Sequence, residues 1–373
     1  MAVRSLTDFF RVKGFVSVAL PTPTADLIQR SQIAEEEGEG GPFDRDDWRV
    51  AYECPSPWRP RNCLAVENGI PLRRFVDGAA RISLLAQHVD PQGNKIALVG
   101  GVIGAMAARV EGQRLRVESE ACPSLHRRPV IAFAAAGYDP SDIEQVRADL
   151  FRGGVFLLEV KPRSRNGRNG NGKSRAFALE TARVAAHTRI VGEMRALELV
   201  AAAGADDAPG EITVVDGNLS THMTNADRHY WPLLGVIKRH RIMPLSGSHL
   251  QCVESLRVGE RTPAFVIESH GENGRCDLVS WYVKIRPDYG VPLRGTIRIE
   301  VPLPWLEESI PEAERTTWYD GVSRTIIGLR AVRSGYSRED CSIQPIVMIE
   351  DRLHAVAGPM DVIATQLRAS LGL

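Results

Sequence analysis

Two apolar segments of this chain each end in the same three residues, Val-Asp-Gly, and a long helical pattern lies between them. The first segment closes at residues 75–78, which read FVDG, and the second at residues 214–217, which read VVDG. Apolar runs that stop at Asp-Gly are typical of buried strands that end in a turn. We therefore expect two strands of one core sheet, each with a carboxylate at its end.

The pattern around these strands predicts a mixed α/β fold, a central sheet flanked by helices. The predicted elements are a hairpin over 95–121 that turns at Gly112, a helix over 177–204, strands within 211–220 and 231–245, a hairpin across 287–290, and a closing helix from 361. In the closing helix, Val362, Ile363, Leu367 and Leu371 are expected to share one apolar face.

Composition excludes several classes of protein. The chain has 373 residues, of which 43% are hydrophobic and 25% charged, so it is able to bury a real core and is neither disordered nor a coiled coil. Its 46 basic residues balance 46 acidic ones. Any binding to nucleic acid must therefore come from a local basic patch.

The cysteines indicate a reducing compartment, and the apolar runs indicate a chain that does not span a membrane. The chain has 6 cysteines but no Cys-x-x-Cys pair, so reduced thiols are expected in place of a disulfide framework or a structural zinc site. The first 15 residues lack a continuous apolar stretch, and the longest apolar run, over 130–136, is too short to span a membrane. We expect a soluble, cytoplasmic protein without a membrane partner.

Residues 1–70 form an expected N-terminal extension to a main domain over 71–373. The extension contains an acidic, Gly-rich run over 34–47, followed by a Trp- and Pro-rich segment. That segment is either a docking or dimerisation surface, or a stretch in which Trp48 and Trp58 pack on the body of the protein.

A basic insertion is expected within the main domain. Residues 163–175 read RSRNGRNGNGKSR, a low-complexity stretch that cannot pack and is expected to be flexible. It is either an arm that follows a phosphate backbone through Arg163, Arg165, Arg168 and Lys173, or a solvated insertion between two elements.

The two strand-end carboxylates, Asp77 and Asp216, are the first candidates for chemistry. A charged carboxylate at the end of an apolar strand is costly unless it is paired or binds a cation. Two such groups suit Mn²⁺ or Mg²⁺, and two metal ions can stabilise both the attacking and leaving oxygens of a phosphodiester. The alternative is that each Asp only starts a turn.

Two further carboxylates are expected to join this pair. Glu198 projects from the apolar stripe of the long helix, with Glu193 as a rival on the same helix. Asp351 follows the apolar run 346–349 at an expected strand-to-helix junction, where Asp is also an ordinary helix cap.

Several short blocks in this order resemble the NurA nuclease family. They are the first Val-Asp-Gly, MRALELV in the helix, TVVDGNLS, LLGVIKRHR, SWYVKI with RIEVPLPW, and PIVMIEDRLHAV. The resemblance covers residues 70–373 and implies an RNase H-like fold, manganese-dependent DNA hydrolysis, a homodimer, and a hexameric HerA-type ATPase as partner. The chain itself has no GxxxxGK[ST] loop, which agrees with ATP hydrolysis by another chain.

By position, Asp77 and Asp216 match the family's strand carboxylates and Glu198 its helical glutamate. Lys238 stands in GVIK, which is similar to the family's GVVK block, where a lysine can neutralise a phosphate. The sequence departs from the family at its closing motif, because Gln344-Pro345 stands where a Tyr-Pro pair is expected.

The function expected from the residues and the resemblance is metal-dependent DNA hydrolysis. The expected ligands of Mn²⁺ or Mg²⁺ are Asp77, Glu198, Asp216 and Asp351, while Lys238 acts on the phosphate. Arg239 and Arg241, together with the basic insertion, are expected to bind the DNA backbone.

Two other functions stay open. The first is a non-catalytic DNA-binding adaptor that regulates a HerA-like ATPase, and the second is an enzyme that acts on RNA or hybrids. The sequence also leaves open whether the hydrolysis is exo- or endonucleolytic, and whether it serves DNA repair or defence against foreign DNA.

Overall fold

The structure is a computed structural model of the whole chain. The residues it describes are 6–17, 48–49, 51–55, 57–89, 95–112, 114–117, 125–135, 138–160, 179–203, 211–219, 232–238, 245–271, 274–288, 290–291, 293–331 and 341–373.

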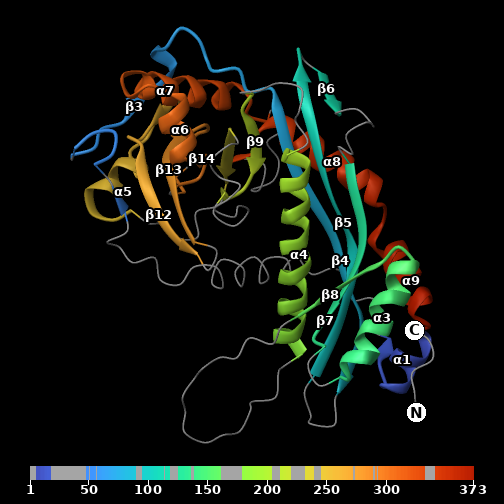
Figure 1. The fold of residues 1–373 in the computed structure, drawn as a ribbon. Coiled ribbons are helices and arrows are strands. Elements are labelled where there is room, and N and C mark those ends of the chain that lie inside the picture. Colours follow the sequence, from blue (N-terminus) through green and yellow to red (C-terminus); the bar gives the residue numbers. More distant parts are fainter. Residues whose placement is uncertain are drawn as a thin grey trace, which may run out of the picture.

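The described residues form a mixed α/β fold with one large sheet (Figure 1). The helices are α1 Leu6–Val12, the 3-10 helix η2 Cys63–Ala65, α3 Pro140–Arg152, α4 Leu179–Ala203, α5 Gly247–Glu254, α6 Leu303–Ser309, α7 Glu312–Gly328, α8 Gln344–Ala357 and α9 Met360–Leu371. The strands are β1 Val16–Ser17, β2 Trp48–Arg49, β3 Arg61–Asn62, β4 Arg74–Val89, β5 Lys95–Glu111, β6 Arg114–Val117, β7 Leu125–Phe133, β8 Phe156–Glu159, β9 Thr213–Asp216, β10 Leu233–Ile237, β11 Glu260–Arg261, β12 Phe265–Gly271, β13 Gly274–Lys284 and β14 Thr296–Pro302.

The sheet has the strand order β2-β12-β13-β14-β10-β9-β4-β5-β7-β8. Strand β9 lies between β4 and β10 and runs parallel to both, whereas the β4–β5, β5–β7, β10–β14 and β13–β14 pairs are antiparallel. Figure 1 shows the consequence for the shape: β12, β13 and β14 with α5, α6 and α7 form one half, the long strands β4 and β5 with α3, α8 and α9 form the other, and β9 and α4 lie between them.

Alternation along each strand sends side chains to two separate layers of helices. In β4, Phe75 and Ala79 belong to the core that contains α7 and α8, while Val76 packs with Leu197 and other residues of α4. The same rule operates in β13, where Trp281 packs towards α7 and Tyr282 towards α5. Because successive strand residues point to opposite faces, helix α4 covers one face of β4 and helix α8 the other.

Several predicted elements are confirmed. The helix predicted over 177–204 is α4, and the strand that ends at the second Val-Asp-Gly is β9, whose last residue is Asp216. The hairpin at Gly112 consists of β5 and β6, and this glycine has a φ of 63°, a value that favours glycine over residues with a side chain. The hairpin across 287–290 consists of β13 and β14.

The first Val-Asp-Gly does not end a strand, so that prediction is wrong. Strand β4 continues through Asp77 and Gly78 to Val89, paired along its length with β5. Tertiary pairing outweighs the local turn preference of Asp-Gly, because the neighbouring strand supplies hydrogen-bond partners on both sides of the glycine.

Two predictions near the carboxyl end are also wrong. The run 346–349 is helical, because Pro345 occupies the first turn of α8, and Ile346, Ile349 and Leu353 form the buried stripe of that helix. In α9 the buried face consists of Ile363, Ala364, Leu367 and Leu371, whereas Val362 is 47% exposed. At 100° per residue, Val362 lies opposite Leu371 on the helix.

The described parts of residues 1–70 pack on the rest of the protein. In α1, Phe9 and Phe10 are completely buried and belong to a core shared with α3 and α9. Strands β2 and β3 pair with β12 and β11, and Trp58 packs against Phe265. A role of this region in docking or dimerisation stays a prediction.

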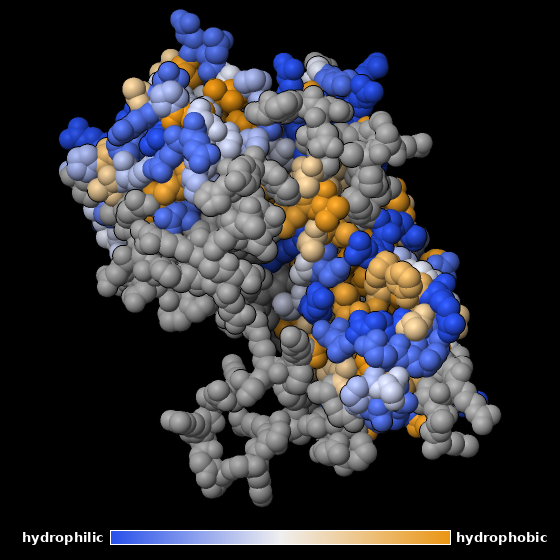
Figure 2. Space-filling model, viewed as in Figure 1, coloured by the Kyte–Doolittle hydropathy of each residue, from blue (hydrophilic) through white to orange (hydrophobic). Residues whose placement is uncertain are grey.

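Within the described ranges, none of the helices combines the length and the apolar character that a membrane-spanning segment needs. Figure 2 shows hydrophilic residues over much of the described surface on the face in view, with hydrophobic residues visible between the two halves, in the region of α4.

Candidate functional site

The two aspartates of the Val-Asp-Gly segments lie on neighbouring parallel strands. Strand β4 pairs with β9 through Val76 and Val215, and the next residue on each strand is Asp77 and Asp216. Strand β9 ends there, while β4 continues, so the pair stands where the parallel ladder stops. Ligand sites of open α/β sheets commonly form at the carboxyl ends of parallel strands.

Glu198 approaches this point from the α4 face of the sheet. It is 2% exposed, and its carboxyl group packs over the backbone of Gly78. A Cβ atom placed on Gly78 would lie 2.3 Å from Oε1 of Glu198 and 2.9 Å from its Cγ. A side chain at position 78 would therefore have to displace the Glu198 carboxyl group, which fills the space beside this glycine.

Asp77 itself points to the opposite face, the one covered by α8. It shares this face with Phe75 and Ala79 by strand alternation, is 5% exposed, and accepts a hydrogen bond of 2.8 Å from the Gly78 amide. Asp77 and Glu198 thus reach the same stretch of β4 from its two faces.

Lys238 is the cation of this cluster. It directly follows β10, and its Nζ lies 2.8 Å from Oδ2 of Asp216. Burial lowers the pKa of Lys238, but the charges of Asp216 and Asp77 outweigh burial, and the pKa is raised. The ammonium group therefore keeps its proton at neutral pH and offsets part of the negative charge.

The carboxyl group of Asp77 is the most perturbed of the cluster. Burial raises its pKa well above the ordinary value, and the charge of Asp216 raises it further, against the opposing charge of Lys238. Glu198 and Glu350 add smaller effects in the same direction. Among the described residues, the negative charges that act on this buried carboxyl group outnumber the positive charge of Lys238, and such an environment favours an added cation.

The contribution of α8 comes from Glu350, not from its neighbour Asp351. Glu350 acts electrostatically on both Asp77 and Lys238 and lies 4.0 Å from His354. Asp351, which the sequence analysis expected as the fourth ligand, is exposed and lines a shallow surface groove beside Leu115 of β6. Successive helix residues differ by 100° in direction, so the two acids point to different surroundings.

The structure also separates the two rival glutamates of α4. Glu193 pairs with Arg128 of β7 at 3.1 Å and with Arg189 at 3.3 Å, and is partly exposed. Glu198 is the one beside Asp77. The apolar neighbours of Glu198 in sequence were the correct signal, because they predict a side chain that points into the protein.

The predicted backbone-binding residues lie outside the described residues. These are Arg239 and Arg241 after β10, and Arg163, Arg165, Arg168 and Lys173 in the basic insertion. Their binding to nucleic acid stays a prediction.

The donor set of the cluster fits a hard divalent cation, although its atoms are not at ligand spacing. Asp77, Asp216, Glu198 and Glu350 offer carboxylate oxygens, the donors that Mg²⁺ and Mn²⁺ prefer. Within the described part of the chain, no three His, Cys, Asp or Glu side chains are arranged closely enough to hold a metal ion. Lys238 occupies one oxygen of Asp216, so a bound cation would have to compete with this ion pair.

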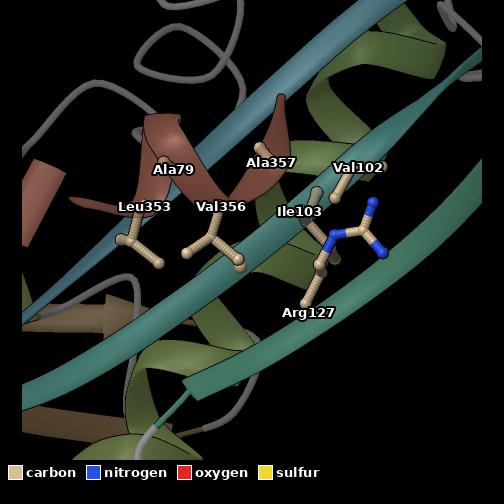
Figure 3. Close-up of a pocket in the computed structure, with 8 residues that line it drawn as sticks. Ala79, Val102, Ile103, Arg127, Leu353, Val356 and Ala357 are labelled. Atoms are coloured by element: carbon tan, nitrogen blue, oxygen red, sulfur yellow. The ribbon is translucent and has the colours of Figure 1, made fainter. Parts of the chain in front are cut away.

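A small cavity lies on the α8 face near Asp77 but is not suited to a substrate. It is lined by Ala79, Ile103, Leu353 and Val356 among others, with Arg127 at its rim (Figure 3). Its accessible volume of about 10 Å³ is room for a single water molecule. The polar cluster itself, at the end of β9, is thus the better candidate for binding a substrate.

Comparison with known proteins adds no assignment to this geometry. No protein-family model matches the chain, and no curated protein has a significantly similar sequence. A functional assignment therefore depends on the residues of the cluster.

Proposed function

We propose that this protein is a metal-dependent DNA nuclease with an RNase H-like arrangement of its central sheet. The observation that carries the proposal is the acidic cluster at the end of β9, where the buried Asp77 stands beside Asp216 on the neighbouring strand and the buried Glu198 packs over Gly78. Burial, and after it the charge of Asp216, raises the pKa of Asp77, and such perturbed groups concentrate at functional sites.

In this proposal Asp77, Asp216 and Glu198, with Glu350 at the rim, would hold Mn²⁺ or Mg²⁺ at the end of β9. Asp77 and Glu198 reach β4 from its two faces, so their carboxyl groups would have to turn towards the end of β9 to share an ion. The bound cation would lower the pKa of a water molecule and stabilise the charge that develops on the phosphate. Lys238, which is protonated beside Asp216, would neutralise a phosphate oxygen once the cation binds the carboxylate. Burial of Asp77 strengthens these electrostatic interactions by excluding water.

The resemblance to the NurA family supplies the wider setting of the proposal. It comprises a homodimer in the cytoplasm that works with a HerA-like hexameric ATPase in DNA repair or in defence against foreign DNA. Arg239, Arg241 and the basic insertion would bind the DNA backbone. Their affinity is expected to fall steeply with salt, because phosphate contacts release counterions.

The test is digestion of end-labelled single- and double-stranded DNA with Mn²⁺, with Mg²⁺ and with EDTA, each with and without a co-purified HerA-like ATPase. The wild type should release label only with a divalent cation. Glu198→Gln should lose this activity, because the amide cannot replace the carboxylate as a ligand of a hard cation.

Glu193→Gln is the matched control on the same helix, since Glu193 pairs with Arg128 away from the cluster. Equal activity of the two variants would count against the proposed site. If the wild type is inert under every condition but still binds DNA, the adaptor function replaces the nuclease function. Release of label only from RNA or RNA–DNA hybrids would instead indicate an enzyme that acts on those substrates.

A further inference from the structure

Arg74 is a completely buried arginine three residues before Asp77 on the same strand. Its exposed fraction is 0%. Its Nη1 donates hydrogen bonds to the carbonyl oxygen of Ala202 at 2.7 Å and to Oγ1 of Thr213 at 3.0 Å, and its Nη2 donates to the carbonyl oxygen of Ala201 at 2.8 Å. A buried guanidinium group is stable only with such partners.

These bonds connect the three elements that carry the acidic cluster. Arg74 itself belongs to β4, Ala201 and Ala202 form the last turn of α4, and Thr213 is the first residue of β9. The corresponding acids are Asp77 on β4, Glu198 one helical turn before Ala202, and Asp216 three residues after Thr213.

The chemistry of the contact explains why an arginine stands here. The last carbonyl groups of a helix have no partner within the helix and carry partial negative charge. The planar guanidinium group donates in two parallel directions, so it holds two successive carbonyls at once and still reaches a third acceptor. A lysine has a single ammonium group and cannot hold α4 in the same fixed way.

We propose that Arg74 is a positioning residue, which sets the placement of α4 along β4 so that the Glu198 carboxyl group lies over Gly78 beside Asp77. The inference rests on the proposed function for its catalytic consequence, but the placement of the helix is a separate, measurable property. Arg74 holds the end of α4 and the start of β9, so it acts on the cluster through the placement of Glu198 and of β9.

Arg368 of α9 provides a matched control within the same chain. Its Nε donates to the carbonyl oxygen of Leu85 at 3.0 Å and its Nη2 to that of Leu84 at 3.1 Å, towards the far end of β4. Arg368→Lys and Arg74→Lys therefore remove the same kind of forked contact to two successive carbonyls. Only Arg74→Lys removes it beside the acidic cluster.

The first measurement is kinetic and uses the full-length protein with Mn²⁺ and labelled DNA. Arg74→Lys should lower kcat about tenfold or more and raise the half-saturating Mn²⁺ concentration about tenfold, with KM for DNA changed less than about twofold, because the support of a ligand is lost and not the binding of DNA. Arg368→Lys should leave kcat, the half-saturating Mn²⁺ concentration and KM within about twofold of the wild type. This should hold even if it lowers Tm as much as Arg74→Lys does.

The second measurement reports the placement of α4 without any catalysis. Gly78→Cys with Glu198→Cys puts two thiols in the space where the missing Cβ of Gly78 lies 2.9 Å from Cγ of Glu198. The rate of their oxidation to a disulfide, identified by peptide mass mapping, should fall about tenfold or more when Arg74→Lys is added, and should not change with Arg368→Lys.

The two measurements distinguish the failure of this inference from the failure of the proposed function. If Arg74→Lys slows cross-linking but the wild-type protein cleaves no DNA, the role of Arg74 in placing α4 is supported and the nuclease function is overturned. An unchanged cross-linking rate, or equal kinetic effects of Arg74→Lys and Arg368→Lys, would overturn the positioning role.

Discussion

Two groups of charged side chains among the described residues, one around Glu53 and one around Asp77, are built in opposite ways. Around Arg261, Glu53 receives hydrogen bonds at 2.7 and 2.8 Å from the guanidinium group, and Asp320 receives one at 2.6 Å. Ala264 and Thr316 also donate to Glu53. Around Asp77, by contrast, the charges of Asp216, Glu198 and Glu350 all raise the pKa of the carboxyl group, and Lys238 is the cation that opposes them among the described residues.

The pKa values of the two carboxyl groups move in opposite directions for this reason. Burial acts to raise both, but in Glu53 the hydrogen bond and the charge of Arg261 outweigh burial, and its pKa is lowered. In Asp77 the charge of Asp216 adds to burial, and its pKa is raised. A balanced ion pair fixes a structure, whereas an unbalanced acidic cluster costs stability and is suited to bind a cation.

The largest expected effect comes from Asp77→Asn, which removes the central carboxylate. Metal-dependent DNA cleavage should fall on the order of 10³-fold. The thermal unfolding temperature at pH 8 should rise, because the variant removes the cost of a buried charge and, with it, the repulsion with Asp216. Rate assays and thermal unfolding of the same preparation measure both quantities. If the variant is less stable than the wild type at pH 8, the Asp77 carboxyl group does not cost stability, and the contrast with Glu53 is wrong.

Glu53→Gln should lower stability and leave activity unchanged, the reverse of Asp77→Asn. It leaves the guanidinium group of Arg261 buried with one fewer charged partner, so the free energy of unfolding should fall by about 3 kcal/mol. The activity per folded molecule should not change. Glu111→Gln, which breaks an exposed pair with Arg116, is the control and should cost less than ~1 kcal/mol in urea unfolding.

The pH dependence of stability should separate the two groups. The folded protein keeps a proton on Asp77 to a higher pH than the unfolded chain, so this contribution to stability is present at low pH and is lost as pH rises from about 4 through the raised pKa. Glu53 contributes above about pH 4 and loses this contribution as pH falls through its lowered pKa.

Urea unfolding from pH 3 to 8 measures these slopes, which reach at most about 1.4 kcal/mol per pH unit for one proton. Relative to wild type, Asp77→Asn should gain stability as pH rises, and Glu53→Gln should approach wild type as pH falls towards 3. Parallel curves for all three proteins would show that neither carboxyl group differs between the folded and unfolded states.

The smallest effect distinguishes the two neighbouring acids of α8. Glu350→Gln should raise the half-saturating Mn²⁺ concentration by about tenfold, because Glu350 adds negative charge at Asp77. Asp351→Asn should change it by less than about twofold. Manganese titrations of nuclease activity measure both effects. A larger effect of Asp351→Asn than of Glu350→Gln would support Asp351 as the metal ligand, as the sequence predicts.

The sequence was most informative where the signal is local. An apolar stretch before Asp77 and an apolar stripe around Glu198 indicate side chains that point into the protein, and the structure buries both. Asp216 stands beside Asp77 on the neighbouring strand, whereas Glu198 reaches the same stretch of β4 from the opposite face. The roles of Gly78 and Arg74 had no such signal. Each depends on α4, whose contact residues are more than 100 positions away along the chain.

The sequence by itself determined helix α4, strand β9, the hairpins at Gly112 and across 287–290, and the closing helix α9, because periodicity follows from the geometry of each element. Only the tertiary structure decided that β4 continues through Asp77, since the partner strand β5 satisfies its backbone. It also decided that Glu350, and not Asp351, faces the cluster. Which of two adjacent helix residues faces a site depends on how the helix packs, and packing is a property of the whole fold.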